Sequence, residues 1–107
     1  MLLKIYYLIS SILVPFYGLY IHRRVKLLKE DQARYIERYG NATVDRKDGD
    51  LIWIHAASVG ECLSALPIIT ELEKIESVNQ ILLTSGTTSS AQIVKDKLSY
   101  KTVHQYL

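Results

Sequence analysis

The chain has 107 residues, of which 49% are hydrophobic and 22% charged, and its formal net charge is +2. This length fits one modest domain and excludes a complete large enzyme, while five glycines, two prolines and no charged tract exclude collagen-like, low-complexity and wholly disordered classes. A single cysteine excludes an internal disulfide and a cysteine-based zinc site, and it is typical of a reducing compartment.

The first predicted element is a membrane-anchoring helix over residues 1–22. Residues 5–21 carry no formal charge, and as a helix they would extend about 26 Å, against a hydrocarbon core of about 30 Å. Tyrosines stand near both ends of this run, where their rings favour the bilayer interfaces, and Pro15 predicts a kink. A helix within one leaflet and a buried helix of a soluble protein are open alternatives. A cleaved signal peptide is disfavoured, because His22-Arg23-Arg24 stand where a cleavage site needs small residues.

The basic residues are distributed unevenly along the chain. Residues 1–29 contain no acidic residue and five basic ones, namely Lys4, Arg23, Arg24, Lys26 and Lys29. Because most of them follow the apolar run, we expect the bulk of the chain to lie in the cytoplasm. Residues 51–107 contain four lysines against five acidic residues, which excludes a basic face suited to nucleic acid.

Residues 23–50 are predicted to form a basic amphipathic helix followed by a linker. Apolar residues recur at helical spacing beside arginines and a lysine: Val25, Leu28, Tyr35 and Tyr39. The pattern indicates a helix on anionic lipid, or alternatively a solvated face docked on the rest of the protein. Gly40-Asn41 would supply its left-handed cap. The polar, turn-rich residues 41–50 predict the domain boundary.

Residues 51–107 are predicted to form part of an α/β domain. The expected elements are a strand at 51–54 covered on both faces, a helix at 59–76, a strand at 79–84, a helix at 89–98 and a strand at 103–106. This parallel β-α-β-α-β order is the start of a Rossmann-like fold, whose strand-to-helix turns lie at the ligand-binding carboxyl edge. A three-stranded sheet leaves both edges unpaired, so we expect marginal folding or dependence on a partner.

The turn over residues 55–61 connects the first strand to its helix. Ser58 and Glu61 have the spacing of a capping box, in which the Glu61 carboxylate reaches back to the Ser58 amide. The alternative is catalytic, because a carboxylate at this edge can take a proton from an acceptor hydroxyl as a general base. Gly60 would let a ligand approach the backbone. The residues alone leave both interpretations open.

The second turn, residues 84–90, contains many hydroxyl groups and a glycine. It favours ordinary turn and cap chemistry, with binding of a phosphosugar as the alternative. The two turns together provide the acceptor-binding candidates Ser58, Gly60, Ser85, Gly86 and Thr87. We expect Cys62 to be a small buried residue, and the three histidines have no spacing typical of a metal site.

The residue block HAASVGE at 55–61, continued by Ala65-Leu66-Pro67, resembles the signature of the bacterial Kdo transferases, which attach 3-deoxy-D-manno-octulosonic acid (Kdo) to the lipid A precursor. Other pieces resemble that family in the same order. They are Glu37-Arg38-Tyr39-Gly40, the turn at 83–87 with Ser89-Ser90-Ala91, and His104-Gln105-Tyr106.

The resemblance implies an inverting glycosyltransferase of GT-B architecture at the inner membrane, with CMP-Kdo as donor and no metal or redox cofactor. Glu61 falls on the family's catalytic glutamate, the proton acceptor for the sugar hydroxyl of the lipid. The family binds the lipid acceptor on its amino-terminal domain and CMP mainly on its carboxy-terminal domain. We therefore expect residues 51–107 to be part of the acceptor domain and to be inactive without a donor half, which a separate polypeptide could supply. The alternative is a non-catalytic, membrane-anchored remnant or binding module.

Overall fold

The computed structural model describes residues 1–107, and these separate into two compact units, residues 1–32 and 33–107. The division therefore falls earlier than the polar stretch 41–50 in which we expected it. The physical reason is that residues 33–50 are bonded to the sheet of the second unit. Arg38 donates to the Gly86 carbonyl and the Lys47 amide donates to the Gln80 side chain.

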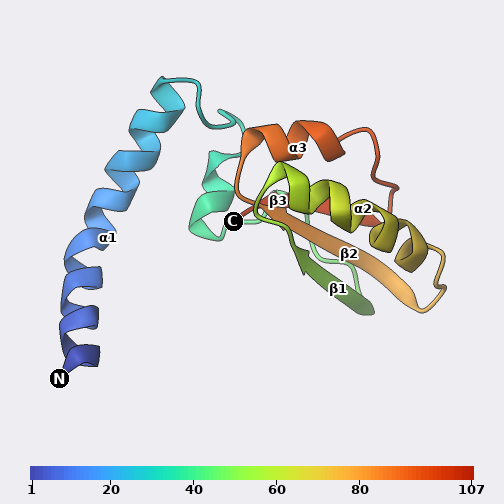
Figure 1. The fold of residues 1–107 in the computed structure, drawn as a ribbon, viewed down its shortest axis with the longest axis horizontal. Helices are drawn as coiled ribbons and strands as arrows, with labels where there is room; N and C mark the ends of the chain where they lie inside the picture. Colours follow the sequence, from blue (N-terminus) through green and yellow to red (C-terminus); the bar gives the residue numbers. More distant parts are fainter. The chain divides into compact units, whose positions relative to one another are not determined.

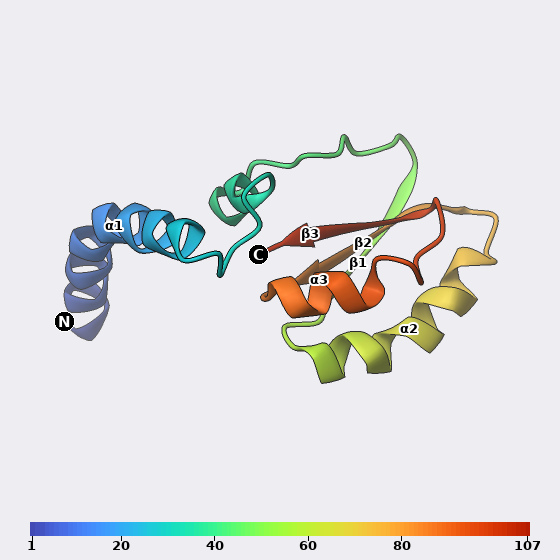
Figure 2. The same ribbon diagram turned by 90° about the horizontal axis from the view of Figure 1, so that it is seen from above.

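The first unit is dominated by α1, the 25-residue helix Leu2–Lys26. Apolar side chains are exposed all around it, as is typical of a helix made for a non-aqueous environment. The helix continues through Pro15, and its axis bends in the view of Figure 2. It is long and apolar enough to cross a membrane, and its most apolar window contains no buried residue.

The prediction of an amphipathic helix from residue 23 onward is wrong, because α1 ends at Lys26. Leu28 adopts the left-handed conformation with φ 57°, and the Lys29 amide closes the turn on the Arg24 carbonyl at 2.9 Å. The Arg24 guanidinium then pairs with Glu30 at 2.7 Å. Left-handed backbone stops helix propagation, so the apolar stripe that the spacing indicated is never formed.

The second unit contains the predicted β-α-β-α-β order, preceded by a short 3-10 helix (Figure 1). Its elements are η1 Tyr35–Tyr39, β1 Asp50–His55, α2 Val59–Glu73, β2 Val78–Ser85, α3 Thr88–Val94 and β3 Thr102–Tyr106. The strands form one parallel sheet in the order β1-β2-β3. The α/β prediction is therefore confirmed, although both helices end a few residues earlier than expected. Gly40, at φ 80°, ends η1 as the predicted left-handed cap.

Helices α2 and α3 cover the same face of this sheet, as Figure 2 shows, while the segment before β1 passes on the opposite side. Ile81 and Leu83 of the central strand are fully buried against the helices, together with Cys62, Ile69 and Val94. Burial of these side chains is what holds the α/β layers together.

The opposite face of the sheet is only partly covered. Trp53 in β1 is 59% exposed, so the expectation that this strand is covered on both faces is wrong. The segment before β1 is tied down by Gln80, which accepts from the Lys47 amide at 2.9 Å. Between that segment and the sheet lies a groove of about 220 Å³, lined in part by Val44, Leu82 and Val103.

Candidate active site at the carboxyl edge of the sheet

The first strand-to-helix turn presents Glu61 at the start of α2. Ser58 is the N-cap, and its hydroxyl accepts from the Glu61 amide at 3.3 Å, as the capping box predicted. The Glu61 carboxylate differs from that prediction by one residue, because its Oε2 accepts from the amide of Ala57 at 2.8 Å. The other carboxylate oxygen, Oε1, has no partner within the chain, and the residue is exposed. One oxygen thus caps the helix while the other is available to a ligand.

The second turn shows the ordinary cap chemistry that its sequence favoured. Thr87 is the N-cap of α3 and accepts from the Ser90 amide at 3.1 Å. Ser85 is completely buried, and its hydroxyl lies 2.6 Å from Nε2 of His104. Of the five acceptor-binding candidates, the structure exposes Ser58, Gly60 and Thr87, leaves Gly86 half-buried, and encloses Ser85.

The two turns are in direct contact. The Gly86 amide donates to the Ala57 carbonyl at 3.2 Å, and a Cβ atom at Gly86 would lie 3.1 Å from that same oxygen. Glycine is therefore the residue that permits this approach without displacing the neighbouring turn. Both turns follow the carboxyl ends of parallel strands, which is the edge where α/β proteins bind ligands. The structure therefore brings Glu61 and four of its predicted neighbours to one edge.

Three side chains at the end of β1 and β2 form a small polar cluster on the face away from the helices. The indole of Trp53 donates to the Thr84 hydroxyl at 2.9 Å, and Nδ1 of His55 lies 2.9 Å from the same oxygen. The Thr84 hydroxyl accepts from the indole, which can only donate, and its second hydrogen-bonding position is used by His55. His55 is exposed at the same sheet edge as Glu61.

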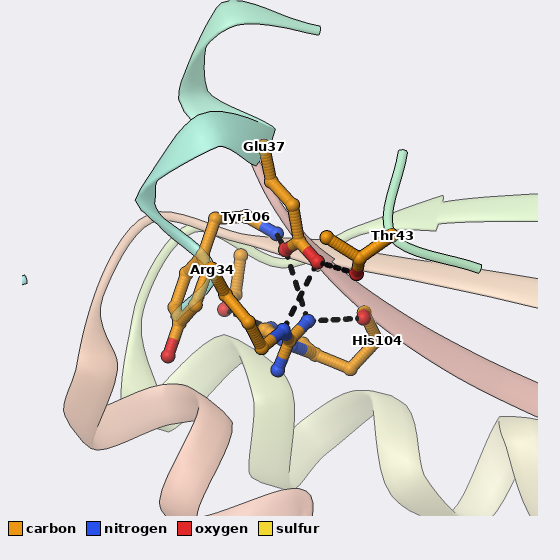
Figure 3. A network of polar contacts seen from close by, with 6 residues as sticks. Arg34, Glu37, Thr43, His104 and Tyr106 are labelled. Carbon is orange, nitrogen blue, oxygen red and sulfur yellow. Dashed lines mark hydrogen bonds and ion pairs between the residues drawn. The ribbon is translucent and has the colours of Figure 1, made fainter. Parts of the chain in front are cut away.

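A buried ion pair ties η1 to the last strand, and sequence reasoning missed it (Figure 3). Glu37 is 1% exposed and receives both arms of the Arg34 guanidinium, at 3.0 and 2.9 Å. It also accepts from the Thr43 hydroxyl and, at 2.9 Å, from the Tyr106 amide. Burial raises the pKa of Glu37, but these hydrogen bonds outweigh burial and keep that pKa below its ordinary value. The carboxylate is thus held in its charged form.

The two arginines of this region bind backbone carbonyls of the second unit, as the docked alternative predicted. Arg34 donates to the His104 carbonyl at 2.5 Å, and Arg38 donates to the carbonyls of Gly86 at 2.7 Å and Leu107 at 2.8 Å. Their guanidinium carbons lie 4.9 and 5.2 Å from the ring centre of Tyr106. The only sequence signal for these contacts was that both segments resemble the family, since their pairing across about 70 residues has no local pattern.

His104 is neutral in the folded chain. Burial, followed by the nearby Arg34 charge, lowers the pKa of His104 from 6.5 to about 4. Arg34 lies 3.3 Å from Nδ1 and can only donate, so Nδ1 is the acceptor and the proton is on Nε2. His104 therefore donates to Ser85, which fixes the strand that precedes the second turn.

Because the pKa of His104 is lowered, we expect the stability of the second unit to fall in acid. Between pH 6.5 and 4 the unfolded chain binds a proton at His104 that the folded chain does not, so stability falls as the pH falls through this window. We expect a loss of about 1–2 kcal/mol in the free energy of unfolding, less than the full linkage because solvent screens the partly exposed ring. Urea denaturation at pH 7 and pH 4.5 measures it. The variant His104→Gln should flatten this dependence, and an unchanged slope in that variant would assign the acid sensitivity elsewhere.

Cys62, as predicted, is a buried residue and is completely enclosed under the first turn. Its thiol lies 3.5 Å from the Ala56 carbonyl, and burial raises the pKa of the thiol, so it is held in the unreactive protonated form. No group of three histidine, cysteine, aspartate or glutamate side chains is close enough to hold a metal ion.

Comparison with known proteins decides the family. Residues 33–107, the whole of the second unit, match the family model described as 3-deoxy-D-manno-octulosonic-acid transferase (kdotransferase). The chain belongs to the Kdo transferase family. It is 39% identical to the 3-deoxy-D-manno-octulosonic acid transferase of Rickettsia bellii (strain RML369-C) over 106 residues, which are 99% of this chain and 25% of that protein.

Other members of the Kdo transferase family match over similar parts of their length. A probable mitochondrial 3-deoxy-D-manno-octulosonic acid transferase from Arabidopsis thaliana is 34% identical over 90 residues, which are 82% of this chain and 20% of that protein. The Rickettsia prowazekii (strain Madrid E) enzyme is 30% identical over 148 residues, with 99% of this chain and 32% of the relative covered. The chain thus spans between a fifth and a third of the length of these relatives. No solved structure matches it significantly.

Proposed function

We propose that this chain is the acceptor-side, amino-terminal part of a Kdo transferase of GT-B architecture that transfers Kdo from CMP-Kdo to a lipid A precursor. The observation that carries the proposal is Glu61, exposed at the carboxyl edge of the sheet with one unpartnered carboxylate oxygen, in a chain that belongs to this family. Ser58, Gly60 and Thr87 are exposed at the same edge of the sheet and are available to an acceptor.

In the proposed reaction Glu61 acts as the general base. Its Oε1 takes the proton of the acceptor hydroxyl while the hydroxyl oxygen forms a bond to the anomeric carbon of Kdo, and the bond from that carbon to the CMP phosphate breaks. The Ala57 amide holds Oε2, which fixes the direction in which Oε1 points. Attack from the side opposite the leaving nucleotide inverts the anomeric centre. The reaction as proposed uses the nucleotide donor without a metal or redox cofactor.

A further strand has a place to join this sheet, next to β1. By the alternation of parallel pairing, the backbone groups of Trp53 and His55 that point away from β2 have no partner, and Trp53 exposes its ring on the uncovered face. In a doubly wound sheet this is the edge that receives the fourth strand. The relatives are three to five times longer than the matched part, so a further portion of such an enzyme is a chemically suitable occupant.

The membrane is the second proposed partner. Helix α1 supports an anchor because its length and exposed apolar surface suit a bilayer, and the basic residues after it suit anionic headgroups on the cytoplasmic side. Such an anchor would hold the second unit near a lipid acceptor. We therefore propose the cytoplasmic face of the inner membrane as the location.

Reconstitution tests this function. The chain is co-expressed with the portion of the Rickettsia bellii enzyme that follows the matched segment, and membranes are assayed for transfer of Kdo from CMP-Kdo to a lipid A precursor. We expect transfer from the pair and none from either polypeptide alone. The variant Trp53→Lys puts a charge on the uncovered face beside the β1 edge and removes the indole bond to Thr84, and we expect it to weaken co-purification of the two polypeptides.

A second candidate is a non-catalytic binding module. It is favoured by the bond between the Glu61 carboxylate and the Ala57 amide, which uses that residue as a helix cap. The same assay separates the two candidates. Co-purification of the two polypeptides and binding of the lipid A precursor without any transfer would support the binding module and contradict the transferase.

A further inference from the structure

We infer that Arg38 is a positioning residue for Glu61, acting through Gly86 and Ala57; the inference rests on the proposed function and assigns Arg38 a part in it. The two residues do not touch. They are joined by a series of hydrogen bonds that crosses three separate segments of the second unit: the end of η1, the turn after β2 and the turn after β1.

The first step of the series is Arg38 itself. Its Nη2 donates to the Gly86 carbonyl at 2.7 Å and its Nη1 donates to the Leu107 carbonyl at 2.8 Å, so one rigid guanidinium bridges two chain segments. The ring of Tyr106, 5.2 Å from the guanidinium carbon, restrains the plane of the fork. A lysine at this position could donate to either carbonyl but has no rigid fork to hold both in one geometry.

The backbone segment that carries Arg38 is also held in place. The preceding turn of η1 is held by the buried Arg34–Glu37 pair, which bonds to the His104 carbonyl and the Tyr106 amide of β3. Arg38 therefore connects the end of β3 to the second turn through a side chain that is restrained at both ends. A charged residue on a mobile loop would not have this property, since its side chain could follow the turn wherever it moved.

The second step runs from Gly86 to Ala57. The Gly86 amide donates to the Ala57 carbonyl at 3.2 Å, and the approach is so close that a Cβ atom at Gly86 would meet that oxygen at 3.1 Å. The position of Gly86 therefore sets the position of the first turn. The third step is the Ala57 amide, which holds Oε2 of Glu61 at 2.8 Å. Through these steps a displacement of Gly86 reaches the carboxylate that is proposed to accept the proton.

The chemical consequence follows from the demands of proton transfer. A general base works only within hydrogen-bond reach of its proton, and small errors in position reduce the rate strongly. The Ala57 amide is the only group of the chain that orients the Glu61 carboxylate. Arg38 thus contributes to the reaction without contacting either substrate.

The test uses the full chain in lipid nanodiscs, isotopically labelled for NMR. Arg38→Met and Arg38→Lys are compared with the matched control Arg46→Met. Arg46 is also an arginine that donates to the carbonyl of a loop glycine, Gly49, at 3.2 Å. The readouts are the exchange rate of the Ala57 amide and the amplitude of its shift when the bonded carboxylate is titrated. The Ser90 amide, held by Thr87, reports whether α3 stays folded.

We expect the Ala57 amide to exchange about tenfold faster in Arg38→Met and its titration amplitude to fall by about half, with an intermediate effect in Arg38→Lys and none in Arg46→Met. Ser90 should be unaffected in all three. The same exchange rate and titration amplitude of the Ala57 amide in wild type and Arg38→Met would overturn the inference. It would also be overturned if the Ser90 amide exchanged faster to the same extent as the Ala57 amide in both Arg38 variants. Since no turnover is measured, this outcome is independent of whether Glu61 proves to be the base.

Discussion

Replacing Glu37 by alanine is expected to destabilise the second unit by about 3–5 kcal/mol, because it leaves the Arg34 charge without its partner and removes the acceptor of the Tyr106 amide. The carboxylate is 1% exposed, so water cannot replace it. Stabilities of small domains are about 5–15 kcal/mol, so this loss would be a large part of the total. Urea denaturation followed by circular dichroism measures the difference at pH 7.

The control for this variant is another glutamate in an ion pair. Glu71 bonds Lys74 at 2.6 Å, but its side chain is 72% exposed, so Glu71→Ala should change the free energy of unfolding by less than about 1 kcal/mol. The double variant Arg34→Met with Glu37→Leu should be more stable than Glu37→Ala alone, since it leaves no unpaired buried charge. A loss below about 1 kcal/mol in Glu37→Ala would show that the pair does not hold η1 to β3.

Replacing Glu61 by glutamine in the reconstituted enzyme is expected to reduce Kdo transfer by about a hundredfold or more, because the amide cannot accept the hydroxyl proton. Glutamine keeps an oxygen that can accept from the Ala57 amide, so the helix cap and the fold should survive. The assay is the transfer of Kdo from CMP-Kdo to the lipid A precursor, with binding of that acceptor measured separately.

The expected pattern is therefore loss of turnover with binding retained. Glu76→Gln is the matched control, because it also removes one exposed carboxylate but lies after the far end of α2. Turnover in Glu61→Gln equal to that of the wild type would eliminate the general-base assignment. A parallel loss of acceptor binding would instead make Glu61 a binding residue.

The α/β part of the fold was predictable because its signals are local. Apolar runs placed the strands, and Ser58 and Thr87 provide the side-chain caps at which the helices begin. The position of Glu61 at the sheet edge followed from the strand-helix order alone. The exact acceptor of its carboxylate did not, since a shift from the Ser58 to the Ala57 amide depends on the conformation of the turn.

The contacts that the sequence did not predict join segments that are far apart in the chain or depend on which face of the sheet a side chain occupies. Arg34 and Arg38 fit a helical stripe, but their partners lie about 70 residues later, where no local pattern reaches. Ser85 is an acceptor-binding candidate by its place in the turn, but alternation along β2 puts it on the same helix-covered face as Ile81 and Leu83, where it is buried. The two-residue period of the strand is visible in the sequence and indicates this burial.

The buried pair of η1 also determines how this sheet can grow. In β3, the His104 carbonyl and the Tyr106 amide point away from β2, and they receive Arg34 and Glu37, a donor and an acceptor placed as a neighbouring strand would place them. Two side chains thus imitate a strand and close that edge to intermolecular pairing, a common route to aggregation. The β1 edge keeps its outward backbone groups unpaired, so any further strand of this sheet would be added beside β1 and not beside β3.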